Sequence, residues 1–490
     1  MNILLVYPQC PDTFWSFRHV LKFVSKKAAF PPLGLLTVAA MLPHAWSLKL
    51  IDLNVASLTD AAIAWADWVF MSGMIVHKDS AHEVAARCTA LGKTVIAGGP
   101  LFTTGYQEFP EIRHFVLGEA EGLIERLVED MKQGELQPTY RLTDWPDVRT
   151  TPVPRWDLIN LHDYVAMPVQ FSRGCPFNCE FCDIVAMNGR VPRTKEPAQV
   201  LRELEMLRLA GWRNMVFIVD DNFIGNPKRA RELLRELIAW RERVRPKMGF
   251  FTEASMNLAD DAALCELMMK AGFKKVFLGI ETPMAESLAE CGKQQNRKRD
   301  MAESVRILQR AGLEVMGGFI VGFDSDPRDI FNRQFEFIQQ TGVVTAMVGL
   351  LNALPQTELY RRLAREGRIL AKTCGNNTDA AINFVTQLDR EFLISGYRNL
   401  MRDLYEPKNY YKRIRAFLHN YQPGGPSLGL SWADLKAFVK SLWVLGVWRQ
   451  GRCAYWGFFW STLFASPRKF HTAIELSILG YHFRRMASRL

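Results

Sequence analysis

The stretch FSRGCPFNCEFCDI, residues 171–184, places Cys175, Cys179 and Cys182 at the spacing C-x-x-x-C-x-x-C in a chain with nine cysteines. A structural zinc site needs four ligands, usually in two separated pairs, and no second cysteine or histidine pair is suitably spaced here. A four-iron cluster held by three thiolates leaves one iron open to a small molecule. The spacing therefore predicts a [4Fe–4S] cluster, and the alternative is three unrelated thiols in a turn.

The cysteine stretch opens a region, from about residue 167 to 363, in which strand-like and helical segments alternate. Its strand-like segments are residues 168–174, 214–222, 249–255, 275–282, 314–323 and 345–351. Six parallel strands with crossing helices predict a partial (β/α)6 barrel, whose active site lies at the carboxyl ends of the strands. The three cysteines follow the first strand, where chemistry is expected.

An earlier set of apolar runs alternates with helical patterns, at residues 2–7, 48–53, 68–73, 94–99 and 114–118. This alternation predicts an open, doubly wound parallel sheet, which binds ligands at the carboxyl ends of its strands. Those ends carry Ser72 and Gly73, then Gly98, Gly99 and Pro100, then Gly118 and Glu119. Glycines there let the backbone approach a large flat ligand, although tight strand-to-helix turns would use the same residues.

The whole chain divides into an α/β N-terminal part, a barrel-like core and a mainly helical C-terminal part. With 490 residues, 48% hydrophobic and 23% charged, it has ordinary globular composition and is too long for one core. The predicted boundaries are 1–135 for the doubly wound domain, 136–166 for a proline-rich linker, 167–365 for the core and 366–490 for the helical domain.

The cysteine loop CPFNCEFC resembles the cluster loop of radical S-adenosylmethionine enzymes, with Phe181 at its aromatic position. The N-terminal domain is similar to the cobalamin-binding domain that precedes this core in one subclass. FPPLGLLTVAAMLP at 30–43, GGP at 98–100 and GEAEG at 118–122 are typical of it. The segment LYEPKNYYKRI and the basic tail after it resemble the uncharacterised domain of the hopanoid C-2 methylase branch.

The resemblance implies three cofactors, namely a [4Fe–4S] cluster, S-adenosylmethionine and cobalamin, which carry the hard chemistry while the protein places them. One electron from the cluster would cleave S-adenosylmethionine to a 5′-deoxyadenosyl radical that takes hydrogen from an unactivated carbon. Methylcobalamin would then methylate that carbon of a hydrophobic substrate, a hopanoid or another lipid. The alternatives are radical rearrangement, cyclisation or oxidation without methyl transfer, and RNA modification.

The resemblance also implies which residues bind the cofactors, although it names no catalytic residue. Asp220 and Asp221 would accept from the methionine amine, with a solvated or helix-capping acid pair as the alternative. Glu253 and, less directly, Glu281 would accept from the ribose hydroxyls, and Ile320 would pack on adenine. The cobalamin-binding residues implied are Leu33, Gly34, Ser72, Gly73, Gly98, Gly99, Pro100, Gly118 and Glu119.

The N-terminal domain departs from cobalamin domains that ligate cobalt by histidine. Those domains carry D-x-H-x-x-G after the first strand, whereas this chain reads YPQCPDTFW there. His77 and His82 lie elsewhere and fit no such spacing. The sequence therefore predicts cobalamin without a protein histidine on cobalt.

The C-terminal 60 residues carry three Lys and six Arg against two acidic residues, a net charge of +7, and hold five tryptophans. The tryptophans are Trp432, Trp443, Trp448, Trp456 and Trp460, and they lie among Lys436, Lys440, Arg449 and Arg452. Such a mixture suits contact with a membrane interface. A helical cap with aromatic core residues is the alternative, and nucleic-acid binding is not expected because no RNA-binding module follows the core.

The remaining features indicate a cytoplasmic enzyme, with peripheral contact at the inner membrane surface as an extension of the lipid interpretation. The other cysteines are scattered, and the N-terminus lacks the basic region of a signal peptide. No apolar run reaches the length of a membrane span. The expected partners are a small-molecule or lipid substrate and an electron donor such as flavodoxin or ferredoxin.

Overall fold

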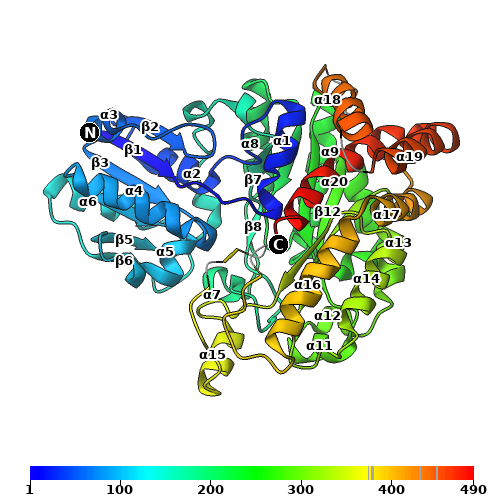
Figure 1. Ribbon diagram of the computed structural model, residues 1–490. Coiled ribbons are helices and arrows are strands. Elements are labelled where there is room, and N and C mark those ends of the chain that lie inside the picture. The colour runs from blue at the N-terminus through cyan, green and yellow to red at the C-terminus, as the bar shows by residue number, and fades with distance from the viewer. Residues whose placement is uncertain (374, 377–379, 427–428, 430–431, 449–450) are drawn as a thin grey trace.

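The computed structural model describes residues 1–373, 375–376, 380–426, 429, 432–448 and 451–490. Figure 1 shows an N-terminal sheet with its helices on the left, a larger sheet with helices in the middle, and helices of the C-terminal part at the upper right. The fold class predicted from the sequence is confirmed in all three parts.

The N-terminal sheet is parallel throughout and has the strand order β2-β1-β3-β4-β5-β6. Its strands are β1 (Asn2–Tyr7), β2 (Ser47–Asp52), β3 (Trp68–Ser72), β4 (Val95–Gly98), β5 (His114–Leu117) and β6 (Thr139–Arg141). The short strand β6 falls within the segment predicted to be a linker, where Tyr140 is buried. The sheet therefore continues beyond residue 135.

Helices cover both faces of this sheet because alternate strand residues point to opposite sides. Leu4 and Val6 pack with α3 (Asp60–Trp65), α4 (Lys78–Ala90) and α5 (Pro100–Gly105). Ile3 and Leu5 pack with α2 (Leu33–Met41) and α6 (Ile124–Gln133) on the other face. Both cores are apolar, so the strands read as continuous hydrophobic runs, as is usual for buried parallel strands.

The second sheet has the order β14-β13-β12-β11-β10-β7, again all parallel, as the predicted six-stranded partial barrel requires. Its strands are β7 (Ala166–Val169), β10 (Met215–Ile218), β11 (Gly249–Ala254), β12 (Phe273–Glu281), β13 (Glu314–Val321) and β14 (Ala346–Leu350). The helices around it are α8 (Pro197–Leu209), α9 (Pro227–Val244), α10 (Ala262–Ala271), α11 (Ala285–Glu290), α12 (Gln294–Arg297), α13 (Met301–Arg310), α14 (Ile330–Thr341) and α15 (Glu358–Arg365).

The C-terminal helices pack on the outside of the barrel and share its hydrophobic core. They are α16 (Arg390–Tyr405), α17 (Pro407–Asn420), α18 (Trp432–Trp443), α19 (Arg452–Ala465) and α20 (Phe470–Ala487). Tyr397 and Tyr405 donate their hydroxyls to strand β14, at Val348 and Ala346. The last helix contacts the N-terminal segment, where His482 Nε2 lies 3.1 Å from the carbonyl oxygen of Phe14.

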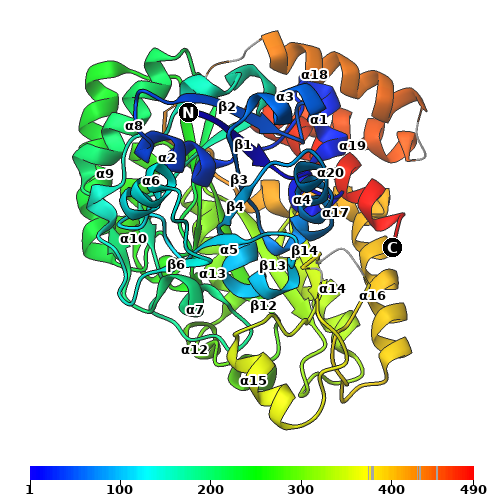
Figure 2. The same ribbon diagram turned by 90° about the vertical axis from the view of Figure 1, so that its left-hand side faces the viewer.

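Over the described ranges, none of the helices combines the length and the apolar character needed to cross a bilayer. Figure 2, turned so that the N-terminal sheet faces the viewer, shows this domain in front of the barrel. The polar strand ends of both parts line one shared cavity, which positions the candidate site.

Candidate functional site

A cavity of about 1100 Å³ lies between the N-terminal domain and the barrel. It is larger than the usual site for one small molecule, roughly 300–1,000 Å³. Every cofactor-binding residue predicted from the sequence lines it, and the role of each stays a prediction. These residues are Leu33, Gly34, Ser72, Gly73, Gly98, Gly99, Pro100, Gly118, Glu119, Phe181, Asp220, Asp221, Glu253, Glu281 and Ile320.

The three cysteines lie on the loop between β8 (Ser172–Arg173) and α7 (Ile184–Asn188), beside the cavity. Two amides point at their sulfur atoms. Asn222 Nδ2 lies 3.8 Å from Cys175 Sγ, and Gln295 Nε2 lies 3.8 Å from Cys179 Sγ. Hydrogen bonds to ligand sulfur are one of the means by which proteins set the potential of an iron–sulfur cluster.

The arrangement of the thiols suits a cluster of several irons. Among the described residues, no three His, Cys, Asp or Glu side chains are close enough to hold a single metal ion. In a [4Fe–4S] cluster each thiolate binds a different iron, so the ligands need not converge on one point. Burial raises the pKa values of Cys179 and Cys182, so both thiols would lose their protons on binding iron.

The acid pair at the end of β10 ties down the cluster loop. Asp220 accepts from the Phe171 amide and the Ser172 hydroxyl, both at 2.7 Å. Asp221 Oδ2 accepts from the Gly174 amide at 2.8 Å and from Asn188 Nδ2 at 3.0 Å. Asp220 is buried and Asp221 half-buried, and both bond to the cluster loop instead of capping a helix. The predicted contact of the pair with the methionine amine stays a prediction.

Three carboxyl groups meet at the floor of the cavity. Burial, and then the charges of Asp221 and Asp220, raise the pKa of Glu253 to about 8. Burial raises the pKa of Asp220 to about 7 despite its hydrogen bonds, and that of Asp221 is raised as well. A bound cation would relieve this repulsion, which suits the positive ammonium and sulfonium groups of S-adenosylmethionine.

Glu281 ends β12 in an unusual conformation and is already paired. Its φ is 66°, in the left-handed region, and its Oε1 lies 2.6 Å from Lys293 Nζ. A Cβ at Gly279 would lie 2.5 Å from both of these atoms, so only glycine fits beneath the pair. Burial disfavours the charge of Lys293, but Glu281 and then Cys179 raise its pKa. Lys293 is therefore a cation beside the cluster loop, and Glu281 as a ribose acceptor stays a prediction.

A buried group of charges joins the N-terminal domain to the cluster loop. Arg173 contacts Glu119 at 2.5 Å and Glu121 at 2.8 Å, and Thr151 donates to Glu121 at 2.7 Å. Arg193, after the loop, also pairs with Glu119. We call these four residues, Arg173, Arg193, Glu119 and Glu121, the interdomain ion-pair network. Glu119, predicted to bind cobalamin, thus has at least a structural role.

The glycines at the ends of the N-terminal strands are of two kinds. A Cβ at Gly99, whose φ is 88°, would lie 2.4 Å from Ser72 Oγ, and one at Gly98 would lie 3.0 Å from the Val116 carbonyl oxygen. Both are therefore needed for tight turns. Gly34 and Gly118 have nothing within 4 Å of an added Cβ and line the cavity. Those two leave open space beside the cavity, and Gly118, whose φ is 91°, is also required by its own turn.

The comparisons with known proteins match all three parts of the chain. Residues 24–128 match the B12 binding domain, 169–338 the Radical SAM superfamily, and 357–490 a domain of unknown function, DUF4070. The hopanoid C-2 methylase of Rhodopseudomonas palustris is 33% identical, over 93% of this chain and 88% of its own. The chain belongs to the cobalamin-binding radical S-adenosylmethionine methyltransferases.

Further relatives of this methyltransferase agree with that assignment. An uncharacterised methyltransferase of Synechocystis is 43% identical, over 99% of this chain and 91% of its own. The radical enzyme OxsB, solved with aqua-cobalamin and S-adenosylmethionine, shares the fold with a TM-score of 0.64 at 14% identity, over 100% of this chain and 80% of its own. Family membership confirms the predicted cofactor set of a [4Fe–4S] cluster, S-adenosylmethionine and cobalamin.

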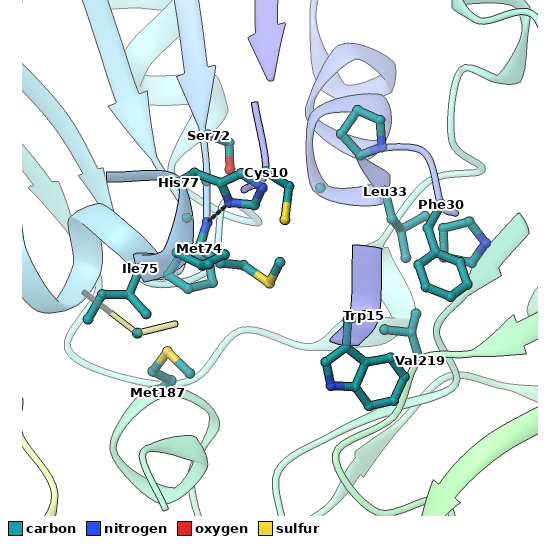
Figure 3. Close-up of a pocket in the computed structure, with 18 of the residues that line it drawn as sticks. Cys10, Trp15, Phe30, Leu33, Ser72, Met74, Ile75, His77, Met187 and Val219 are labelled. Carbon is teal, nitrogen blue, oxygen red and sulfur yellow. Dashed lines mark hydrogen bonds between the residues drawn. The ribbon is translucent and has the colours of Figure 1, made fainter. Parts of the chain in front are cut away.

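His77 lines the N-terminal side of the cavity in this methyltransferase. The position of its ring proton does not suit ligation of cobalt. His77 is 1% exposed, and burial lowers its pKa to about 4, so it is neutral at pH 7. Its Nδ1 accepts the Met74 amide at 3.0 Å, which places the ring proton on Nε2. Figure 3 shows this bond and the ring beside Cys10 and Ser72. Nε2 has no partner among the described residues, so it suits a hydrogen-bond acceptor on a ligand.

We therefore expect the cobalt(II) spin-resonance spectrum of the cobalamin-loaded protein to lack splitting by a nitrogen of the protein. His82 cannot supply one, because it lies 2.6 Å from Glu111 and stacks on Phe109 outside the cavity. The spectra of the parent, His77→Ala and His82→Ala proteins should all lack this splitting. His77→Ala should bind cobalamin more weakly, by roughly tenfold if one buried hydrogen bond is lost. Nitrogen splitting that disappears in either variant would contradict the interpretation.

Sequence reasoning missed several residues of the methyltransferase site. Lys293, Asn222 and Gln295 approach the cluster loop, and Arg173 and Glu121 form half of the interdomain ion-pair network. Arg173 lies within the opening cysteine stretch and Glu121 within GEAEG, but each looks like an ordinary surface charge in the sequence. The left-handed Glu281 in GIET carried no signal either, because only the fold places Lys293 opposite it.

Proposed function

We propose that this methyltransferase methylates an unactivated carbon of an apolar, lipid-like substrate. The observation that carries the proposal is the apolar wall of the cavity. Trp15, Phe30, Leu33 and Val219 face the space opposite His77 and Met74 (Figure 3), and Phe277 lies 5.1 Å from Trp15 between ring centroids. Such a wall favours a substrate without charged groups.

The charges around the cavity support the same substrate class. Among the described residues that line it, the Lys and Arg side chains are Arg18, Lys27 and Arg173. Each has an acidic partner: Asp12 for Arg18, Asp163 for Lys27, and Glu119 and Glu121 for Arg173. A phosphate-rich substrate such as RNA needs unpaired cations, so the cavity favours a neutral apolar molecule. A hopanoid is the substrate class named for the relative from Rhodopseudomonas palustris.

The residues of this chain divide the work of the reaction. When bound, the cofactors supply a carbon-centred radical oxidant and a transferable methyl group. Asp220 and Asp221 hold the cluster loop, Glu253 and its neighbours favour a cationic ligand on the barrel side, and Lys293 places a positive charge beside the thiols. The apolar wall excludes water, which protects reactive species from side reactions.

We also propose that a separate one-electron carrier, flavodoxin or ferredoxin, reduces the cluster. The cluster loop supports this because its cysteines are partly exposed and Arg190 beside it is exposed. Acidic carriers would be attracted to such a cation. Product analysis with and without each reduced carrier would test the proposal.

The decisive experiment is anaerobic incubation of the reconstituted enzyme with bacterial lipids and S-adenosylmethionine carrying a labelled methyl group. We expect a lipid heavier by one methylene unit that carries the label, and none with the Cys182→Ala protein. A lipid of unchanged carbon count would instead indicate rearrangement or oxidation. Labelled RNA with unlabelled lipid would contradict the proposed substrate class.

A further inference from the structure

The most exposed aromatic surface of the described chain lies on the hairpin formed by α18, the π-helical turn Val444–Trp448 and α19. Figure 1 shows α18 and α19 at the end of the molecule away from the N-terminal sheet. Of the eighteen large apolar side chains that are exposed in the described ranges, eight lie here. They are Trp432, Leu435, Val439, Trp443, Val447, Trp448, Trp460 and Phe464, which we call the hairpin face.

The hairpin face is not needed to hold the hairpin together. Its inner side is packed, since Phe438 stacks on Phe459 at 6.2 Å and Phe459 meets Phe470 at 5.1 Å. Trp456 donates to the Gly446 carbonyl at 3.0 Å and is partly buried. By contrast, Trp432 is 76% exposed, Trp448 72% and Phe464 78%. The predicted helical cap is therefore present, and a second, outward aromatic surface exists beside it.

Basic residues border the hairpin face. Lys436 and Lys440 lie on α18 among its apolar residues, and Lys440 Nζ donates to the Lys22 carbonyl oxygen on α1 (Arg18–Val24). Lys22 also lines a second cavity together with Arg18, Arg485 and Arg489. Asp12 is the acidic residue that lines this cavity. Arg485 Nε is buried there without a partner among the described residues. Arg449, also predicted to belong to this basic set, lies outside the described residues.

We propose that the hairpin face docks on an anionic lipid membrane, with its aromatic side chains at headgroup depth and the bordering cations on lipid phosphates. Contiguous exposed apolar side chains bordered by polar residues usually mark a binding surface. Tryptophans at the interface together with adjacent Lys and Arg are the combination that anionic bilayers attract. The mixed aromatic and cationic border favours this occupant over a second copy of the chain, whose identical cations would repel.

The docking surface is also connected to the proposed substrate cavity. Helix α1 packs against α18 and α20, and the residues just before it, Phe14 and Trp15, line the cavity. A lipid leaving the membrane at the hairpin would therefore meet the segment that walls the cavity. This step rests on the proposed lipid substrate, whereas membrane binding itself can be measured without turnover.

The test is co-sedimentation of the full chain with vesicles of phosphatidylcholine alone or mixed with phosphatidylglycerol. We expect binding to the anionic vesicles at low salt and weaker binding as salt screens the charges. Trp432→Ala combined with Trp448→Ala should lower the partition coefficient by roughly tenfold or more, because each ring loses its apolar burial. Leu209→Ala, an exposed residue on α8, is the matched control and should leave binding unchanged.

Lys436→Glu tests the charge contribution separately and should weaken binding to the anionic vesicles. Lys228→Glu on α9 is its control and should leave that binding unchanged. Inorganic phosphate at matched ionic strength should not displace the protein, because a free anion cannot replace the aromatic contact. Vesicle binding by the parent that survives in the tryptophan variant would overturn the assignment of the surface. A parent that ignores anionic vesicles at low salt would overturn membrane docking, and a dimer broken by the tryptophan changes would then identify a second copy as the occupant. Methylated lipid with no vesicle binding would leave the proposed function standing alone.

Discussion

Replacing any one of Cys175, Cys179 or Cys182 with Ala is expected to abolish cleavage of S-adenosylmethionine. Each thiolate holds a separate iron of the cluster, so two ligands cannot keep it in the loop. The iron–sulfur absorbance and the release of 5′-deoxyadenosine should therefore fall to background together. Both quantities are measured anaerobically, by spectroscopy after reconstitution and by chromatography of the reaction.

The matched control is Cys453→Ala, which removes an exposed thiol of α19 far along the chain from the cluster loop. It should retain full iron content and full cleavage. The cysteine variants should also remain folded, because the loop is fastened by Asp220 and Asp221 as well as by the cluster. Cleavage that persists when all three cysteines are replaced would refute the assignment.

Arg173→Leu is expected to destabilise the contact between the two α/β parts by about 3–5 kcal/mol. The change leaves Glu121, whose side chain is 4% exposed, without its cation, whereas Glu119 keeps its pair with Arg193. Breaking one side of a buried ion pair has this cost because the remaining charge is both desolvated and unpaired. The readout is the midpoint of urea unfolding followed by fluorescence, together with retention of cobalamin on gel filtration.

Two further variants separate charge from packing. Arg173→Leu combined with Glu121→Gln should recover part of the stability, because Glu119 keeps Arg193 and no unpaired carboxylate remains. Arg149→Leu, which breaks an exposed pair with Asp147, should shift the midpoint of urea unfolding far less than Arg173→Leu does. Equal losses in Arg173→Leu and Arg149→Leu would show that burial does not set the strength of the interdomain ion-pair network.

The same network should make the contact acid-labile. Burial alone would raise the pKa of Glu121, but Arg173 lowers it to about 2 from its ordinary value of 4.5. A carboxyl group whose pKa is lower in the folded state stabilises that state fully above its unfolded pKa. The stabilisation is therefore present above about pH 4.5 and disappears as the pH falls toward 2. In Glu121→Gln this part of the acid dependence should be absent.

Much of the fold could be predicted because parallel strands buried on both faces leave continuous apolar runs. The apolar runs at residues 215–218 and 276–280 predicted strands β10 and β12. The glycine-rich strand ends predicted where the ligand cavity lies. The short strand β6 was missed because only Tyr140 of its three residues is buried, too little for a periodic signal. Pro138 just before it and the polar residues that follow it are typical of a linker.

The candidate site could be predicted where local spacing carries the chemistry, as in the three cysteines. It could not be predicted where chemistry depends on chain segments far apart in the sequence. Lys293 pairs with Glu281, whose own backbone is left-handed. Glu121 contacts Arg173 only after the two domains pack together. The sequence pointed to Asp220 and Asp221, but their bonds to backbone amides of the cluster loop form only in the folded chain.

The two ion pairs of Glu119 have a consequence for how the enzyme acquires its cofactors. Arg173, before the cluster loop, and Arg193, after it, both form ion pairs with the Glu119 carboxylate of the N-terminal domain. Whatever orders that loop therefore also strengthens the hold on the neighbouring domain, and by thermodynamic reciprocity the converse is true. We therefore expect insertion of the iron–sulfur cluster and binding of cobalamin to be coupled, so that each cofactor is retained more tightly when the other is present.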